Sequence, residues 1–182
     1  QPTTAQWISE HGLAKTIQDF FVVSFHSFWA QFGWMGILID SRLYVLLGVV
    51  SVAAALGFIL FVARTIYNRR LLTSFQLWAL VLLLLVFVLV AGEHVLYNLK
   101  FVQHQGRYLF PALVPIGLAF ALGLLEWANV LVRLISRLAR LERFAGQLRG
   151  IMKGIAFCLF YAGFLVLDVV CLYLFIVPHF RR

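Results

Sequence analysis

Charged residues are scarce in this sequence, and their scarcity excludes most classes of soluble protein. Asp, Glu, Lys and Arg make up only 12% of the 182 residues, whereas hydrophobic residues make up 63%. The mean hydropathy of +0.96 lies far outside the range of a soluble globular domain. We therefore expect an integral membrane protein.

Acidic residues are scarcer still, with seven against fifteen Lys and Arg, which gives a net charge of +8. Such a charge can indicate nucleic-acid binding. Here, however, the basic residues lie between or beside long apolar runs, where they set membrane topology and contact lipid phosphates. We expect membrane lipids as their partners and no nucleic acid.

Metal and haem ligands are also lacking. The two cysteines, Cys158 and Cys171, lie in one apolar run without a set of metal ligands beside them, which is typical of buried packing residues. The five histidines fall at or beyond the outer ends of the apolar runs, so no span offers an axial haem ligand. We expect neither a metal nor a cofactor.

The chain opens with QPTTAQWISEHG, which has neither an initiator Met nor the order of a signal peptide. This beginning is expected of a processed chain or of a piece of a longer one. No internal repeat or low-complexity linker divides the sequence, so residues 1–182 are interpreted as a single membrane module.

Long apolar runs are what the sequence has in abundance. About 20 apolar residues cross the hydrocarbon layer as a helix. Because the connections between most runs are short, neighbouring spans should be antiparallel. The sequence predicts an all-α membrane bundle with four transmembrane helices, at residues 43–63, 75–97, 109–125 and 155–177.

The basic residues between the runs predict the orientation of the bundle. The links after the first and third spans carry nine of them, and the opposite side carries six. Because basic residues favour the cytoplasmic side, both Arg-rich links should be cytoplasmic and both termini outside. The expected location is the cytoplasmic membrane of a bacterium.

Two segments outside the spans have one apolar and one polar helical face. Residues 130–148 place Arg133, Arg137 and Arg140 opposite a row of leucines, which predicts a basic helix on the cytoplasmic surface that anchors to lipid or, alternatively, docks a protein. Residues 1–41 form the outer segment. Within it, residues 13–32 predict an interfacial helix whose apolar face includes Leu13, Ile17, Phe20, Phe21, Phe25, Phe28 and Phe32.

A polar loop, residues 103–107 with the sequence QHQGR, joins the second and third spans on the outer side. Gly106 permits a tight turn, Pro111 suits the first turn of a helix, and Pro115 lacks the N–H that would bond back to an earlier carbonyl. A helix start beside a guanidinium can bind phosphate or pyrophosphate. The candidate phosphate or lipid-headgroup site comprises Arg107, His104, Gln105, Glu93 and His94.

The alternative for this loop is structural. Arg107 would then contact lipid phosphate, and Gly106 would form a turn. His94 and His104 would lie at the membrane interface without a catalytic or ligand-binding role. No nucleophile or metal set accompanies the arginine. Both interpretations place the loop at the membrane surface.

Asp168 is the one acidic residue near the middle of a predicted span. A charged carboxylate there is costly, so Asp168 should be a buried acid that is protonated, paired or directed into the bundle. A local hydrogen bond and a role in proton transport are both compatible with this position.

Two motifs together resemble a family of bacterial multi-pass membrane proteins. These are FWxxFGW and QGRYxxPxxP, and the resemblance extends from Ser24 to Leu125. That family is grouped with the GT-C-type glycosyltransferases, which use polyprenyl-phosphate-linked sugars. The resemblance implies a helical membrane bundle with its polar face toward the outside, and polyprenyl-phosphate sugar as a partner. Gln105 and Arg107 match recurrent positions of the family, and Arg107 and its loop would lie nearest to any phosphate. The motif positions are Phe28, Trp29, Phe32, Gly33, Trp34, Gly106, Tyr108, Pro111 and Pro115.

The sequence also departs from that family. Enzymes of the GT-C type carry a catalytic acid in an outer loop near their N-terminus, and Asp19 and Asp40 stand in a different setting here. The module is therefore expected not to be catalytic by itself. It is either the C-terminal part of a transferase or a non-catalytic accessory subunit of a large bacterial membrane complex, such as an electron-transport or photosynthetic assembly. A proton-coupled transporter is a weaker third hypothesis, because no inverted repeat is present.

Overall fold

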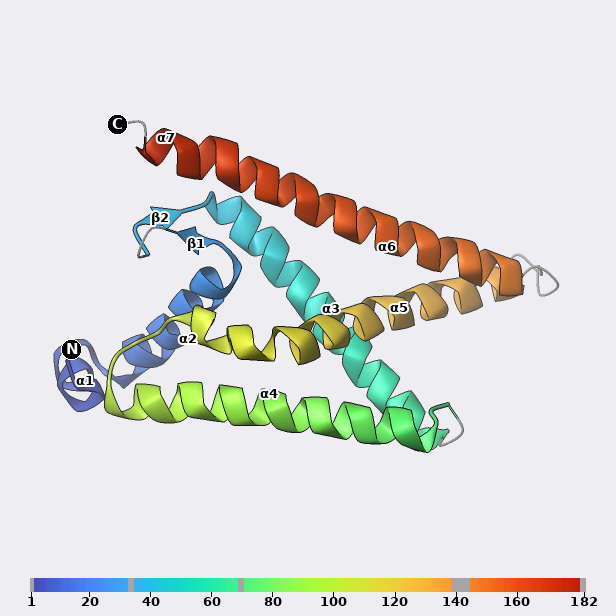
Figure 1. Cartoon of the computed structure of the whole chain (residues 1–182), viewed down its shortest axis with the longest axis horizontal. Helices are drawn as coiled ribbons and strands as arrows, with labels where there is room; N and C mark the ends of the chain where they lie inside the picture. The colour runs from blue at the N-terminus through green and yellow to red at the C-terminus, as the bar shows by residue number, and fades with distance from the viewer. Residues whose placement is uncertain (1, 33–34, 69–70, 139–144, 181–182) are drawn as a thin grey trace.

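The computed structural model describes residues 2–32, 35–68, 71–138 and 145–180, and these residues are mostly helical (Figure 1). Four runs are long and apolar enough to cross a membrane, which confirms the all-α class and the four spans. They are α3 (Ser41–Tyr67), α4 (Ser74–Lys100), the run Gly106–Ile135 and the run Gly150–His179. The third run joins the 3₁₀ helix η1 (Gly106–Ala112) to α5 (Leu113–Leu138); the fourth joins α6 (Ala145–Val170), η3 (Cys171–Ile176) and α7 (Val177–Phe180).

Side-chain caps fix where two of these helices begin. The Asp40 carboxylate accepts a hydrogen bond from the backbone N–H of Arg42 at 2.8 Å and caps α3. Thr73 and Gln76 exchange bonds with each other's backbone and form a capping box at the start of α4. These polar caps lie directly before the apolar runs, so each span starts close to its predicted boundary.

The crossing of α3 and α5 is the most extensive helix contact, and two glycines make it possible. A Cβ atom at Gly57 would collide with the backbone carbonyl of Gly123, and one at Gly123 would collide with that of Ala54. The Trp127 indole N–H donates to the Ala53 carbonyl at 2.8 Å beside this contact. The two backbones meet in van der Waals contact, as small residues allow in membrane bundles.

The N-terminal helices α1 (Thr4–His11) and α2 (Leu13–Trp29) pack at the end of the molecule where α4 ends and η1 begins (Figure 1). Of the range 13–32 predicted as an interfacial helix, residues 13–29 are helical in the structure. After it, β1 (Gln31–Phe32) pairs antiparallel with β2 (Ile37–Leu38) in a short hairpin. That these helices lie in the outer interface stays a prediction.

Part of the predicted apolar face of α2 lies at the surface of the molecule. Leu13, Ile17 and Phe21 are exposed, whereas the buried residues of the helix are the small polar Thr16, Ser24 and Ser27. The reason is that the neighbouring backbone approaches this side closely, and serines leave room for it while supplying hydrogen bonds. The large apolar side chains are left for lipid or for other protein.

The separate basic helix predicted over residues 130–148 is not what the structure shows. The α5 helix continues without a break to Leu138, and α6 begins at Ala145. No Gly or Pro interrupts residues 124–138, so nothing in the sequence stops the third span at 125. Arg133 and Arg137 belong to α5, the Arg137 side chain is not among the described ones, and Arg140 lies outside the described residues.

Candidate functional site

The polar loop is held against α2 by a contact that only glycine allows. The Gly106 N–H donates to the Ser27 hydroxyl at 2.7 Å. A Cβ atom at Gly106 would collide with the Ser24 carbonyl and would press on Phe28. Gly106 is therefore required for the close approach of η1 to α2.

A buried hydrogen-bond chain joins the serine face of α2 to α4. The Ser24 hydroxyl lies 3.1 Å from His94 Nε2, and the Asn98 amide nitrogen lies 3.4 Å from His94 Nδ1. The Gln103 N–H donates to Asn98 Oδ1 at 3.0 Å, which fixes the orientation of that amide. The same amide nitrogen donates to the His94 carbonyl at 2.9 Å, so Asn98 is held between the His94 backbone and the start of the polar loop.

The Ser24 and His94 pair has the spacing of a nucleophile and its general base. Both side chains are buried, with Ser24 9% and His94 6% exposed. The contact between them joins α2 to α4 inside the fold.

His104 completes the buried part of the candidate set. His104 is only 7% exposed. The Phe20 ring lies edge-on to the His104 ring, with the ring centroids 5.6 Å apart, and it stacks on the His94 ring, with the centroids 5.3 Å apart. Burial lowers the pKa of His104 below its ordinary value, and the nearby Asp19 carboxylate opposes this in part. The ring is held neutral inside the fold.

The remaining candidate residues are less buried. Arg107 is half-buried, with its guanidinium 5.9 Å from the centre of the Tyr108 ring. Glu93 is exposed on α4, whereas the adjacent His94 is buried, so the two side chains predicted to act together have different surroundings. Gln105 Oε1 is buried and accepts no hydrogen bond from any described residue. The loop thus combines a half-buried cation with one unsatisfied acceptor.

The motif residues that carry the family resemblance mostly pack the fold at this end. The Phe28 ring lies 5.9 Å from that of Phe110 in η1. Trp29 contacts the rings of Phe120 and Phe164, with centroids 5.7 and 5.6 Å away. Among the other motif positions, Phe32 packs against the core cluster of Ala30, Ile39, Tyr44, Leu47 and Cys171. Tyr108 and Pro111 are exposed, and Pro115 is buried. Gly33 and Trp34 lie outside the described residues.

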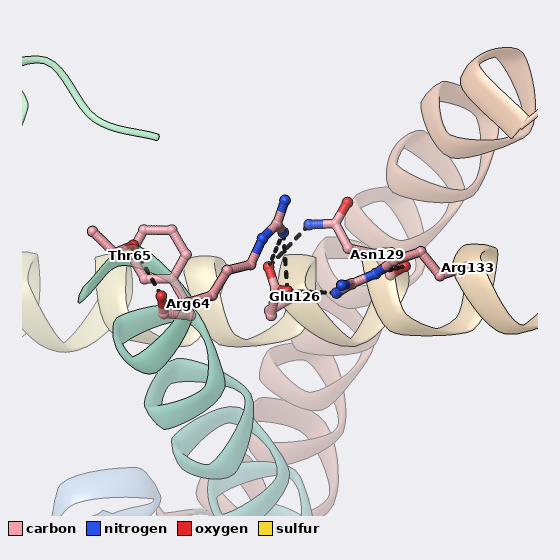
Figure 2. A network of polar contacts seen from close by, with 6 residues as sticks. Arg64, Thr65, Glu126, Asn129 and Arg133 are labelled. Atoms are coloured by element: carbon pink, nitrogen blue, oxygen red, sulfur yellow. Dashed lines mark hydrogen bonds and ion pairs between the residues drawn. The ribbon is translucent and has the colours of Figure 1, made fainter. Parts of the chain in front are cut away.

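An ion-pair cluster that the sequence analysis missed lies at the other end of the bundle (Figure 2). The Glu126 carboxylate, 4% exposed, accepts hydrogen bonds from Arg64 at 3.0 and 3.1 Å and from Arg133 at 2.9 Å. The Asn129 amide donates to it at 3.1 Å. Arg64 comes from α3 and the other three residues from α5, so the cluster ties the two crossing helices together.

This cluster gives Arg133 a partner that the sequence analysis did not predict. Arg133 was expected to contact lipid head groups from a surface helix, and its side chain is 45% exposed. Its guanidinium nevertheless binds Glu126, one residue beyond the predicted end of the third span. The spacing of Glu126, Asn129 and Arg133 at i, i+3 and i+7 along a helix was the signal available in the sequence.

Asp168 is not buried. The structure places its side chain at an exposed position of α6, so the prediction that it faces the interior of this bundle was wrong. The physical reason is that the inner side of α6 and η3 is formed by Phe164 and Leu167 of α6 and Cys171 of η3. These residues pack against Trp29 and the core residues around Tyr44. Asp168 lies beside that face and outside the contact.

An apolar cavity of about 440 Å³ lies between α3, α4 and α5 and is separate from the polar loop. Its lining contains Phe58, Phe61, Leu84, Pro115 and Phe120, and none of the loop residues 103–107. Within the part of the chain that the structure describes, no group of His, Cys, Asp and Glu is arranged to hold a metal ion. No family model, curated protein or solved structure matches this chain.

Proposed function

We propose that this chain is a non-catalytic module of a larger bacterial membrane assembly, in which other membrane-spanning segments cover its helices. The observation that carries the proposal is how little of each span the chain buries by itself. In the most apolar window of each span, 17%, 0%, 11% and 6% of the residues are buried, in chain order. No residue in that window of α4 is buried. Contacts with the rest of this chain therefore contribute little to holding a helix such as α4 in place.

The state of the polar residues supports the same proposal. Ser24, His94 and Asn98 form hydrogen bonds within the fold, and the ring of His104 is enclosed by its neighbours. These are the groups from which an active site at the polar loop would be built. Their contacts hold α2, α4 and η1 together, which is a structural role.

Gentle detergent extraction from the native membrane tests this proposal. A native gel followed by mass spectrometry should find the chain in a stoichiometric band with other membrane subunits. Recovery of the chain alone, with its native helix content and without any other polypeptide, would contradict the proposal. A single longer polypeptide that contains the chain would favour the second candidate.

The second candidate is the C-terminal part of a transferase that uses a polyprenyl-phosphate sugar. It is supported by the family resemblance and by one structural feature, the unsatisfied Gln105 Oε1 next to Arg107. A sugar hydroxyl can donate to that oxygen, and a guanidinium can bind the phosphate. In membranes that contain the complete transferase, Arg107→Gln should abolish sugar transfer, whereas Lys100→Gln should not.

The orientation of the module follows from the same proposal. The ends of α3 and α5 and the start of α4 lie at one end of the molecule, and η1 lies at the other (Figure 1). In the sequence, the links that follow the first and third spans carry nine basic residues, and this charge favours the cytoplasm for the first of these ends. The polar loop and both termini would then face the outside of the cytoplasmic membrane.

A further inference from the structure

Asp168 is an exposed acidic residue at the depth of the hydrocarbon layer. It lies eleven residues before the end of the run Gly150–His179, which is about 16 Å along a helix. Its neighbours on the surface three residues before it and four after it, Leu165 and Leu172, are large and apolar. No hydrogen bond or ion pair joins Asp168 to any residue that the structure describes.

A carboxyl group in this position requires a partner. In hydrocarbon, neither water nor lipid tails can satisfy a carboxylate, so acidic residues within spans face protein or a water-filled cavity and pair with another polar group. The described residues supply no such pairing at Asp168. A group that satisfies this carboxyl therefore has to come from outside the described part of the chain.

The exposed face around Asp168 has the spacing of a helix-packing seam. Tyr161, Leu165, Asp168 and Leu172 follow one another at intervals of four, three and four residues. Tyr161 and Leu165 are each 66% exposed and Leu172 is 44% exposed. Within α6 this spacing places Tyr161, Leu165 and Asp168 on one face, as in the seam between two packed helices, and Leu172 follows at the start of the π-helix η3. The occupant that fits the face is a helix.

The charge of Asp168 indicates what kind of helix can bind to this face. In a symmetric pair of two copies of this chain across the seam, one Asp168 would lie opposite the other, and two like charges at one depth repel. The Lys and Arg residues of the spans whose side chains the structure describes lie near the ends of the spans: Arg42, Arg64, Lys100, Arg107 and Arg133. A second copy therefore offers no described cation at this depth.

We propose that the α6 seam binds a transmembrane helix of a different polypeptide that carries a Lys, Arg or His at the depth of Asp168. The inference rests on the proposed function, because it names the chemistry of one partner in the assembly. The basic side chain and Asp168 form a charge-assisted hydrogen bond within the membrane. The apolar residues of the seam pack on either side of it.

The first test places a photo-crosslinking amino acid at Leu165 in the chain in its native membrane. Leu159→photo-crosslinker is the control, because Leu159 is 69% exposed on another side of α6. The Leu165 probe should capture one other polypeptide, within a spanning segment that contains a basic residue. Crosslinking to a second copy of the chain, or to lipid alone, would overturn the proposal.

The second test uses charge reversal in the intact assembly. Asp168→Lys should reduce the captured partner at least tenfold, and exchange of the partner's basic residue for Asp should restore it. Val166→Asn, which adds an amide elsewhere on α6, should retain the partner. Retention of the partner by Asp168→Asn and Asp168→Leu at the wild-type level would contradict the inference.

These experiments separate failure of the inference from failure of the proposed function. If the wild-type chain is recovered alone from its membrane, the proposed function is wrong and no partner exists. If the assembly is recovered but survives every Asp168 substitution, the proposed function stands and only the seam proposal fails. The photo-crosslinking test leaves Asp168 in place, so it does not depend on the folding of an Asp168 variant.

Discussion

The two ends of this bundle are held together by different chemistry. At the knot end, where α2, η1 and the end of α4 meet, the contacts are hydrogen bonds between uncharged groups such as Ser24, His94 and Asn98. At the ion-pair end, one buried carboxylate, Glu126, binds two arginines. Neutral groups can be enclosed completely, whereas the arginines of the charged cluster stay 39% and 45% exposed.

The comparison indicates how each end can respond to its surroundings. The knot end joins segments far apart in the sequence and encloses neutral histidines, so it should be sensitive to steric change and to acid. The ion-pair end joins two helices that already pack through glycines, so it should be sensitive to loss of charge. Each of the following predictions separates the two ends by one of these properties.

The largest expected difference is in chemical accessibility from the two sides of the membrane. With the proposed orientation, a cysteine at Gln105 should react fully with a membrane-impermeant thiol reagent added outside the cell. A cysteine at Ser136, near the ion-pair end, should not react until the membrane is opened. The reverse pattern would show that the orientation is wrong, and the proposed phosphate contact of Arg107 would fail with it.

A side chain at position 106 should cause the largest loss of stability. Gly106→Val places atoms where the Ser24 carbonyl lies, and we expect roughly 3 kcal/mol of destabilisation, the upper range for overpacking. Thermal unfolding in detergent, followed by circular dichroism, measures the effect. Gly117→Ala is the control, because its Cβ would meet no atom within 4 Å. Equal stability of the two variants would mean that η1 does not pack against α2 as described.

Removal of the charge at Glu126 should destabilise the ion-pair end. Glu126→Gln leaves Arg64 and Arg133 facing each other without a counter-charge. Loss of one partner from a buried pair costs about 3–5 kcal/mol, and we expect about 2 kcal/mol because solvent screens both arginines. The same unfolding experiment measures it, with Glu10→Gln at an exposed position as the control. A change below about 0.5 kcal/mol, the usual range for surface substitutions, would show that the cluster contributes little.

The smallest effect should come from acid, and it should be confined to the knot end. The folded state lowers the pKa of His104, so its stabilising contribution is complete above the ordinary value near 6.5 and is lost as the pH falls below it. Unfolding temperatures should therefore fall between pH 7.5 and pH 5. His104→Gln should reduce this fall, and His11→Gln, at an exposed position, should leave it unchanged. A pH dependence identical in all three proteins would exclude His104 as its source.

The sequence predicted the four spans because long apolar runs are a local signal, independent of how the helices pack. It did not reveal the glycine contact at Gly106, since Gly106 lies 79 residues from Ser27 and only the folded chain brings them together. Glu126 was overlooked because it lies just beyond an apolar window. Asp168 was assigned to the interior because hydropathy gives depth in the membrane but not direction around a helix.

The most direct test of the central proposal is to ask whether the open faces of the spans are covered in the native membrane. A lipid-soluble carbene reagent can be activated by light in native membranes and, separately, in vesicles that contain the chain alone, and labelled residues can be mapped by mass spectrometry. If the chain is a module of a larger assembly, Val81, Val88 and Leu165, all exposed in the structure, should be labelled in the vesicles and protected in the native membrane. Equal labelling in both would mean that lipid covers these faces, and it would contradict the proposal.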